Sequence, residues 1–342
     1  MVSTQEELNQ AIAAVRQAAI FCHQIRSEKR IRSMNKADGS PVTNADFGSQ
    51  ALIVQNLRKL YATDPVMAEE TASRADFQDD AFTDELILDL QNAGGCFSSV
   101  DEIVKAINRG DSESGEPHAI WRDRYWVIDP IDGTKGYLKG GQYAIALGLI
   151  EKGQIKLAVL ACPEFSLPGH ADKGFLLYAL KNEGAYAQPL FREAGAVKLI
   201  VSDRSYDGGM RMCESLNHSP TGTSAKVAAQ LGISDSQIDR MDSQSKYAAV
   251  ASGAADIYLR LPTSKAYREA VWDHAAGVLI VEEAGGKVSD IYGQPLVWND
   301  SRSWHDNHRF PAAHGVVVTN TRIHHEVIEA IRSILQSAGE TA

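Results

Sequence analysis

An apolar run that ends abruptly in two acids places the strongest constraint on how this chain can fold. Residues 126–137 read Trp-Val-Ile-Asp-Pro-Ile-Asp-Gly-Thr-Lys-Gly-Tyr. Proline fixes φ and removes a backbone donor, and glycine permits backbone angles that other residues avoid. The run therefore predicts a strand that ends in a sharp turn, with Asp129 and Asp132 pointing the same way.

Two carboxylates held this close repel each other, so a cation is expected between them. Carboxylate oxygens and the Ile131 carbonyl form a hard oxygen site, which suits Mg²⁺ better than any nitrogen or sulfur site. A structural Ca²⁺ loop is the main alternative, although the run lacks the dense Asp/Asn alternation of an EF-hand. Thr134 and Lys135 add a hydroxyl and a cation suited to handling a phosphate.

The order of the expected elements divides the chain in two. With 342 residues and 44% hydrophobic content, the chain can bury the cores of two domains or subdomains. Paired apolar runs predict successive strands at residues 143–150, 155–162, 174–180 and 184–188. These strands are expected to form a largely antiparallel sheet that is covered by the earlier helices. After residue 190 helices and strands alternate, so we expect an α+β subdomain over residues 1–190 and an α/β subdomain over 191–342.

Composition excludes several classes of protein. A formal net charge of -10 argues against a broad nucleic-acid-binding surface. The amino terminus lacks signal-peptide features, and no run approaches the roughly 20 apolar residues of a membrane span, so we expect a cytoplasmic protein without a membrane partner. The four cysteines have no paired spacing, which speaks against a zinc site and a disulfide framework.

Further acids lie upstream of the central run. Asp46 is expected in the first turn of a helix, where complementing the helix dipole is an ordinary alternative to a catalytic role. Glu69 and Glu70 follow the short apolar run 65–68, and a solvated surface pair is the ordinary reading of such a doublet. Residue type alone leaves these alternatives open.

Four motifs, in this order, resemble the lithium-sensitive, magnesium-dependent phosphatases of the inositol monophosphatase superfamily. They are Pro-Val-Thr-Asn-Ala-Asp at 41–46, the Glu pair at 69–70, Asp-Pro-Ile-Asp-Gly-Thr at 129–134, and Trp-Asp-His-Ala-Ala-Gly at 272–277. The resemblance covers roughly residues 5 to 335. It implies a layered αβαβα sandwich with the site between the two subdomains.

Within that superfamily the chain is most similar to the 3'(2'),5'-bisphosphate nucleotidases, which implies a role in sulfur metabolism. The Asp-Gly-Thr sequence is followed by Lys135 and Gly136, where the inositol enzymes typically have asparagine. Residues 242–247 and 256–262 also fit the nucleotidase pattern. His218 aligns with its adenosine-pocket histidine, although a histidine beside Ser-Pro could simply belong to a loop.

The resemblance implies a role for each matching residue. Two to three Mg²⁺ ions would be held by Glu69, Asp129, the Ile131 carbonyl, Asp132 and Asp273. Asp46 and Thr134 would orient and deprotonate a metal-bound water. The substrate would contact Gly133, Lys135, His218, Ser243, Lys246 and Arg260, with the last two the best candidates for binding the phosphate that is retained. A surface lysine, a serine cap and an arginine salt bridge are the ordinary alternatives for three of these positions.

The implied reaction is magnesium-dependent removal of the 3'-phosphate of adenosine 3',5'-bisphosphate, giving AMP and phosphate, with the 5'-phosphosulfate analogue as a second substrate. A monomer is expected. An inositol phosphate phosphatase is the nearest alternative, and a non-catalytic nucleotide sensor is an alternative from another class. One departure is Ala68, where the family commonly has glycine before its Glu pair, and the choice of Glu69 over Glu70 rests on alignment.

Overall fold

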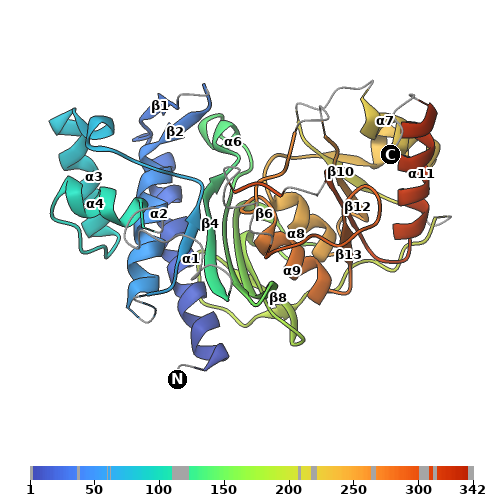
Figure 1. Cartoon of the computed structure of the whole chain (residues 1–342), viewed down its shortest axis with the longest axis horizontal. Helices are drawn as coiled ribbons and strands as arrows, with labels where there is room; N and C mark the ends of the chain where they lie inside the picture. The colour runs from blue at the N-terminus through green and yellow to red at the C-terminus, as the bar shows by residue number, and fades with distance from the viewer. Residues whose placement is uncertain are drawn as a thin grey trace.

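The fold is seen in a computed structural model. It describes residues 3–36, 39–59, 61, 63–109, 123–206, 209–216, 222–262, 267–299, 308–310 and 314–337. Helices and strands alternate in layers across the long axis of the molecule (Figure 1).

The first layer is a pair of helices, α1 (Thr4–Ser27) and α2 (Asn44–Arg58), that pack against each other. Helix α1 begins with a capping box in which Ser3 and Glu6 bond reciprocally. Helix α2 begins with the same device, formed by Thr43 and Asp46. The cap of α2 therefore fixes Asp46 in a buried first turn, as the sequence predicts.

Smaller elements surround this helix pair. They are the antiparallel ribbon of β1 (Ser33–Asn35) and β2 (Pro41–Thr43), the 3-10 turn η1 (Arg74–Phe77), and helices α3 (Asp80–Asn92) and α4 (Val100–Ile107). Helix α3 is absent from the sequence-based expectations. Its signal is present, because Phe82, Leu86 and Leu90 recur every four residues behind the N-cap Asp79.

The second layer is a seven-stranded sheet in the order β3-β4-β5-β6-β7-β8-β9. Its strands are β3 (Val66–Ala68), β4 (Arg124–Asp132), β5 (Ala144–Glu151), β6 (Gln154–Ser166), β7 (Lys173–Leu180), β8 (Gly184–Pro189) and β9 (Val197–Lys198). All neighbours are antiparallel except β3 and β4, which pair in parallel through Val66 and Trp126. Because helices cover both faces, β5 is buried along nearly its whole length.

The third layer is formed by α8 (Ser245–Ala251) and α9 (Ala275–Glu283), which contact both sheets. The second sheet has the order β11-β10-β12-β14-β13 and mixes parallel with antiparallel pairs. Its strands are β10 (Met212–Glu214), β11 (Ile238–Arg240), which follows the turn η2 (Asp235–Gln237), β12 (Ile257–Arg260), β13 (Lys287–Ser289) and β14 (Val316–Thr319).

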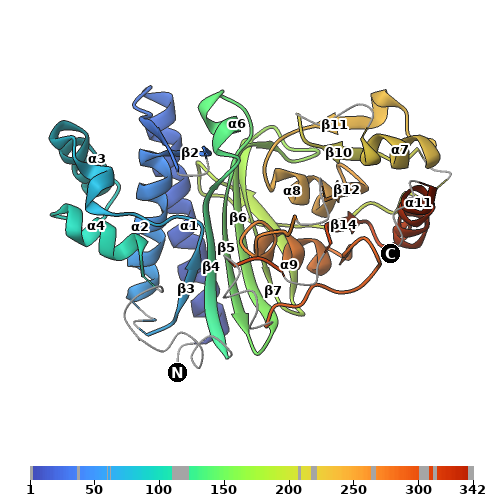
Figure 2. The same ribbon diagram turned by 45° about the horizontal axis from the view of Figure 1, so that its top comes forward.

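The last layer contains α7 (Thr223–Gln230) and α11 (His324–Ser337), which close the outer face of the second sheet. Figure 2 shows the same sequence of layers from a second direction. Among the residues that the structure describes, three separate hydrophobic cores fill the spaces between layers. The predicted αβαβα sandwich, largely antiparallel in its first half and mixed in its second, is confirmed.

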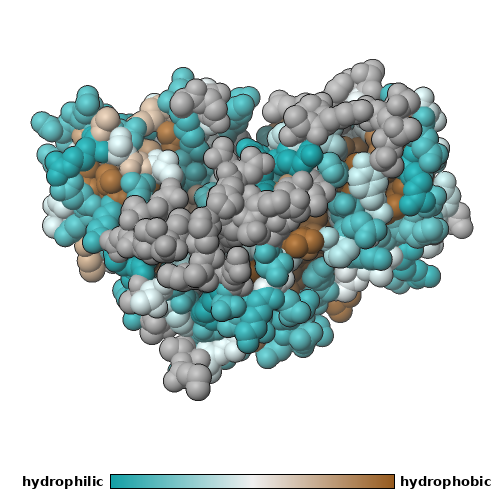
Figure 3. All heavy atoms as spheres, viewed as in Figure 1, coloured by the Kyte–Doolittle hydropathy of each residue, from teal (hydrophilic) through white to brown (hydrophobic). Residues whose placement is uncertain are grey.

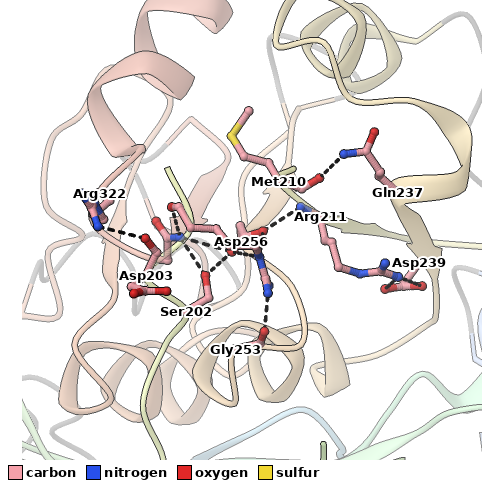
Figure 4. Close-up of polar contacts among 11 residues, drawn as sticks. Ser202, Asp203, Met210, Arg211, Gln237, Asp239, Gly253, Asp256 and Arg322 are labelled. Atoms are coloured by element: carbon pink, nitrogen blue, oxygen red, sulfur yellow. Dashed lines mark hydrogen bonds and ion pairs between the residues drawn. The ribbon is translucent and has the colours of Figure 1, made fainter. Parts of the chain in front are cut away.

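A buried carboxylate holds the second sheet together. Asp256 is fully buried just before β12. It accepts hydrogen bonds from the Ser202 hydroxyl, from Arg204 Nε at 2.8 Å, from the Arg211 backbone N–H at 2.6 Å and from Asn320 Nδ2 at 3.2 Å. Figure 4 shows Asp256 among these contacts. The starts of β10 and β12 are thereby tied to the end of β14.

The expected boundary at residue 190 stays a prediction. Strand β9, at Val197–Lys198, still pairs with β8 of the first sheet, although it lies beyond residue 190, where the second half was expected to begin. On the face seen in Figure 3, the described residues are mainly hydrophilic, and apolar atoms form small separate patches. Within the described ranges, no helix has the length and apolar character needed to cross a membrane.

Candidate active site

A cleft of about 770 Å³ lies at the end of β4, where the short helix α6 (Thr134–Leu138) begins. Figure 2 shows α6 beyond the upper end of β4. The second half contributes the opposite wall, including the end of β12. Charged residues of both signs line the cleft: Glu69, Asp132, Lys135, Asp242, Lys246, Arg260, Glu269 and Asp273. The acids of the cleft could hold a metal ion, and its basic side chains could bind an anionic ligand.

The turn after β4 brings its two acids to one side. The pairing with β5 shifts register between Asp129 and Asp132, so the strand bulges at Pro130. Gly133 then adopts a left-handed φ of 86°, and a Cβ there would lie 3.1 Å from the Cβ of Ser243. Asp129, Asp132 and Asp273 each offer a carboxylate oxygen within 4.8 Å of the others.

The surroundings of the Asp129 carboxylate show whether a metal ion fits this site. Its side chain is 1% exposed, and neither carboxylate oxygen accepts a hydrogen bond from a donor among the described residues. Burial, followed by the charges of Glu69, Asp132 and Asp273, raises the pKa of Asp129 well above its usual range. Buried carboxylates without donors call for a cation, and this oxygen set matches the preference of Mg²⁺. The residues therefore fit the expected ion.

The Glu pair divides between two environments. Glu69 lines the cleft beside Asp129, with 28% of its side chain exposed. Glu70 is 3% exposed, and its backbone bonds with the Gln50 side chain. Lys36 Nζ bridges the pair, at 3.1 Å from Glu69 and 2.6 Å from Glu70. The geometry favours Glu69 as the residue that faces a ligand.

Asp46 lies next to Thr134. The Thr134 hydroxyl is 3.2 Å from Asp46 Oδ1 and 3.2 Å from the carbonyl oxygen of Ile131, both of which can accept its proton. The other Asp46 oxygen accepts the Thr43 backbone N–H at 2.8 Å. Burial raises the pKa of Asp46 to about 7. A carboxyl with this pKa can gain or lose a proton near neutral pH.

Asp132 is held by the second half of the chain. The backbone N–H of Gln244 donates to Asp132 Oδ2. This contact requires an unusual turn, because Ser243 adopts a φ of 68°, which only a small fraction of non-glycine residues show. Burial and the charge of Asp273 raise the pKa of Asp132 to about 7. The turn at Ser243 thus links the two walls of the cleft.

Two cations face the acids. Lys246 is 4% exposed, and its Nζ donates to the carbonyl oxygens of Ser243 at 2.7 Å and Met241 at 3.2 Å. Arg260 Nη2 donates to Asp273 at 2.6 Å. Both side chains line the cleft, which makes them available to an anionic ligand.

Most expected site residues therefore converge. Ser243, Gly133 and Lys135 also line the cleft, whereas His218 lies outside the described residues. The sequence reasoning missed Lys36, Gln244 and the buried pair Glu269 and His274. The last two carried a usable signal, because they flank Asp273 in an otherwise apolar stretch.

Comparisons relate nearly the whole chain to known proteins. A family model described as the inositol monophosphatase family matches residues 3–336. A 3'(2'),5'-bisphosphate nucleotidase from Emericella nidulans is 39% identical, over 98% of this chain and 100% of its own. A protein of the same name from Schizosaccharomyces pombe is 36% identical, over 97% of both chains.

A solved structure shares the fold. The IMPase of Thermotoga maritima superposes with a TM-score of 0.63 over 97% of this chain and 99% of its own. Its sequence is 22% identical, so this likeness concerns the layered architecture alone.

Proposed function

The chain belongs to the inositol monophosphatase family, as its motifs indicate, and from this membership we propose that it is a magnesium-dependent 3'(2'),5'-bisphosphate nucleotidase. The proposed reaction converts adenosine 3',5'-bisphosphate to AMP and phosphate. The 5'-phosphosulfate analogue is proposed as a second substrate. Relatives that carry this name at 36% and 39% identity support the substrate class.

One observation carries the proposal: a buried carboxylate without a hydrogen-bond donor among the described residues lies beside a cleft whose opposite wall presents two cationic side chains. Asp129 needs a positive partner, and Lys246 and Arg260 offer positive charge on the opposite wall. Metal ions that carry one phosphate of the substrate would balance the charge of Asp129. A second phosphate would balance the charges of Lys246 and Arg260. A substrate with two phosphates therefore fits the charge distribution better than one with a single phosphate.

Glu69, Asp129, Asp132, Asp273 and the Ile131 carbonyl are proposed to hold two to three Mg²⁺ ions. Bound Mg²⁺ supplies Lewis-acid chemistry, because it lowers the pKa of water and stabilises negative charge on a leaving ribose oxygen. The oxygen donors and the uncompensated burial of Asp129 support this assignment.

The protein residues are proposed to position and deprotonate the attacking water. Thr134 accepts a hydrogen bond from the water and passes its own hydroxyl proton toward Asp46 Oδ1, 3.2 Å away. Asp46 can receive that proton because burial raises its pKa to about 7. The water oxygen then bonds to phosphorus as the bond to the ribose oxygen breaks, and this direct displacement needs no covalent phosphoenzyme.

Substrate orientation is assigned to the other residues of the cleft. Lys246 and Arg260 are proposed to bind the retained 5'-phosphate, with Ser243, Gly133, Lys135 and His218 completing the contacts. Lys246 keeps one donor for a ligand, since two backbone carbonyls account for only two of its three protons.

A substrate panel tests the proposal. Purified protein with Mg²⁺ should release phosphate from adenosine 3',5'-bisphosphate faster than from an inositol monophosphate, and addition of EDTA should stop the reaction. Faster turnover of the inositol phosphate would replace the nucleotidase by the nearest alternative. Nucleotide binding without any phosphate release would favour a sensor.

A further inference from the structure

A chain of buried polar groups extends from Arg260 at the cleft wall into the protein interior, and its first member, Glu269, itself borders the cleft. It consists of Glu269, His274 and Tyr247, all of which are 0% exposed. Glu269 and His274 lie between β12 and α9, and Tyr247 belongs to α8. None of the three has a role in the proposed chemistry, yet Glu269 contacts Arg260, a proposed substrate-binding residue.

The contacts run in one direction. Arg260 Nε is 2.5 Å from Glu269 Oε2, and the same oxygen is 3.1 Å from His274 Nε2. His274 Nδ1 is 2.6 Å from the Tyr247 hydroxyl. An anionic Glu269 can only accept, so His274 carries its proton on Nε2 and accepts the Tyr247 proton on Nδ1. One arrangement of protons thus satisfies every contact.

Close packing holds the far end of this chain in place. A Cβ added to Gly277 of α9 would lie 2.2 Å from the Tyr247 ring, so the ring rests directly on the helix backbone. Tyr247 also makes an edge contact with Tyr258, with ring centroids 5.2 Å apart. The hydroxyl that fixes His274 therefore has little freedom to move.

Arg260 has two competing acceptors. Its Nε faces Glu269, whereas its Nη2 donates to Asp273 and to the Tyr267 hydroxyl. Among the described residues, no hydrogen bond uses Nη1. Without Glu269, only the Nη2 contacts to Asp273 and Tyr267 would hold the guanidinium, which could then rotate further toward Asp273. With Glu269, Nη1 stays available to a ligand.

We propose that Glu269, fixed by His274 and Tyr247, is a positioning residue that sets the orientation of Arg260 and thereby the affinity for the phosphate that the reaction retains. This inference rests on the proposed function, in which Arg260 contacts that phosphate. Glu269 acts through the arginine and does not touch the reacting phosphate.

The two products separate this role from a general structural one. AMP carries the retained phosphate, and inorganic phosphate occupies the position of the transferred one. We expect Glu269→Gln to raise the KM for adenosine 3',5'-bisphosphate and the inhibition constant of AMP about tenfold, the effect of losing one charge-assisted hydrogen bond. The inhibition constant of inorganic phosphate should change less than about twofold, and kcat less than about threefold, because the reacting groups are untouched.

A milder variant and a matched control accompany this measurement. Tyr247→Phe removes one hydroxyl, and it should shift the AMP constant in the same direction by about two- to threefold, as expected for one neutral hydrogen bond. Asp256→Asn removes a buried carboxylate from another arginine, Arg204, outside the cleft. It should leave both product constants unchanged.

A double-mutant cycle gives the decisive result. In an Arg260→Gln background, Glu269→Gln should add less than about twofold to the AMP constant, because its effect passes through the arginine. Equal effects in both backgrounds, parallel changes for AMP and inorganic phosphate, or an unchanged AMP constant would each overturn the positioning role. If the unmodified protein releases no phosphate from the bisphosphate, the proposed function itself fails, which is a separate outcome.

Discussion

Replacing Asp256 by asparagine should destabilise the fold without altering catalysis. Every described polar contact of this carboxylate comes from a donor: Ser202, Arg204, Arg211 and Asn320. An asparagine amide brings two N–H donors of its own into this set. In either orientation of the amide, its NH2 group would face at least one existing donor, because both carboxylate oxygens accept from Arg204 and Oδ2 also accepts from Arg211.

The magnitude follows from burial. Asp256 is fully buried, whereas the side chain of Arg204 is 29% exposed. Breaking a buried ion pair costs about 3–5 kcal/mol, and we expect this range because the donors around Asp256 lose their anionic acceptor. A chain of 342 residues unfolds with an entropy of about 0.7 kcal/mol/K, so the midpoint of thermal unfolding should fall by roughly 4–7 °C. If the second half unfolds as a separate unit, the shift should be about twice as large.

Asp239 provides the matched comparison. It binds Arg211 Nη2 at 2.8 Å, but 42% of its side chain is exposed. Such surface pairs contribute about 0–1 kcal/mol, so Asp239→Asn should move the midpoint by about 1 °C or less. Differential scanning calorimetry of the three proteins measures both shifts. Similar small shifts for the two variants would refute the reasoning that burial makes Asp256 important.

Three further outcomes are expected. Asp132→Asn should lower phosphate release more than about 100-fold, since loss of even a supporting group around a metal costs about 10- to 100-fold; circular dichroism should stay unchanged, and substantial residual activity would remove Asp132 from the ligand set. Tens of millimolar LiCl should inhibit turnover relative to KCl, as the family resemblance implies, and equal rates in both salts would count against the assignment. Burial lowers the pKa of His324 from 6.5 to about 4. Between these pH values the unfolded chain binds a proton at this histidine that the folded chain does not bind. The free energy of unfolding should therefore fall as the pH drops from 6.5 to 4. Urea midpoints at pH 7 and pH 5 should therefore differ less in His324→Gln than in the unmodified protein.

Local patterns predicted most elements of the fold. The expected runs 143–150 and 155–162 correspond to β5 and β6, and helix α7 is among the alternating elements expected after residue 190. The parallel pairing of Val66 with Trp126 could not be read from the sequence, because it joins two strands that lie 60 residues apart along the chain. Helix α3 was not predicted, although its apolar residues recur at helical spacing behind the N-cap Asp79.

In the candidate site, too, local features could be predicted from the sequence, whereas contacts between distant segments could not. Asp129 and Asp132 could be paired from their spacing and the proline between them. Asp273 could be added only through the family resemblance, since its approach depends on how α9 packs. The bond from the Gln244 backbone to Asp132 had no sequence signal at all, because it depends on the left-handed turn at Ser243 and on the contact between the two halves.

The proposed metal ligands come from both halves of the chain. Glu69, Asp129 and Asp132 lie at the ends of β3 and β4, whereas Asp273 precedes α9. An ion bound to both groups acts as a reversible cross-link. By thermodynamic linkage, an ion present at a hundred times its dissociation constant adds about 2.7 kcal/mol to the stability of the joined state. The free magnesium concentration would then decide whether the two halves unfold together or in separate steps, so the same ions that serve the reaction would also set the cooperativity of the fold.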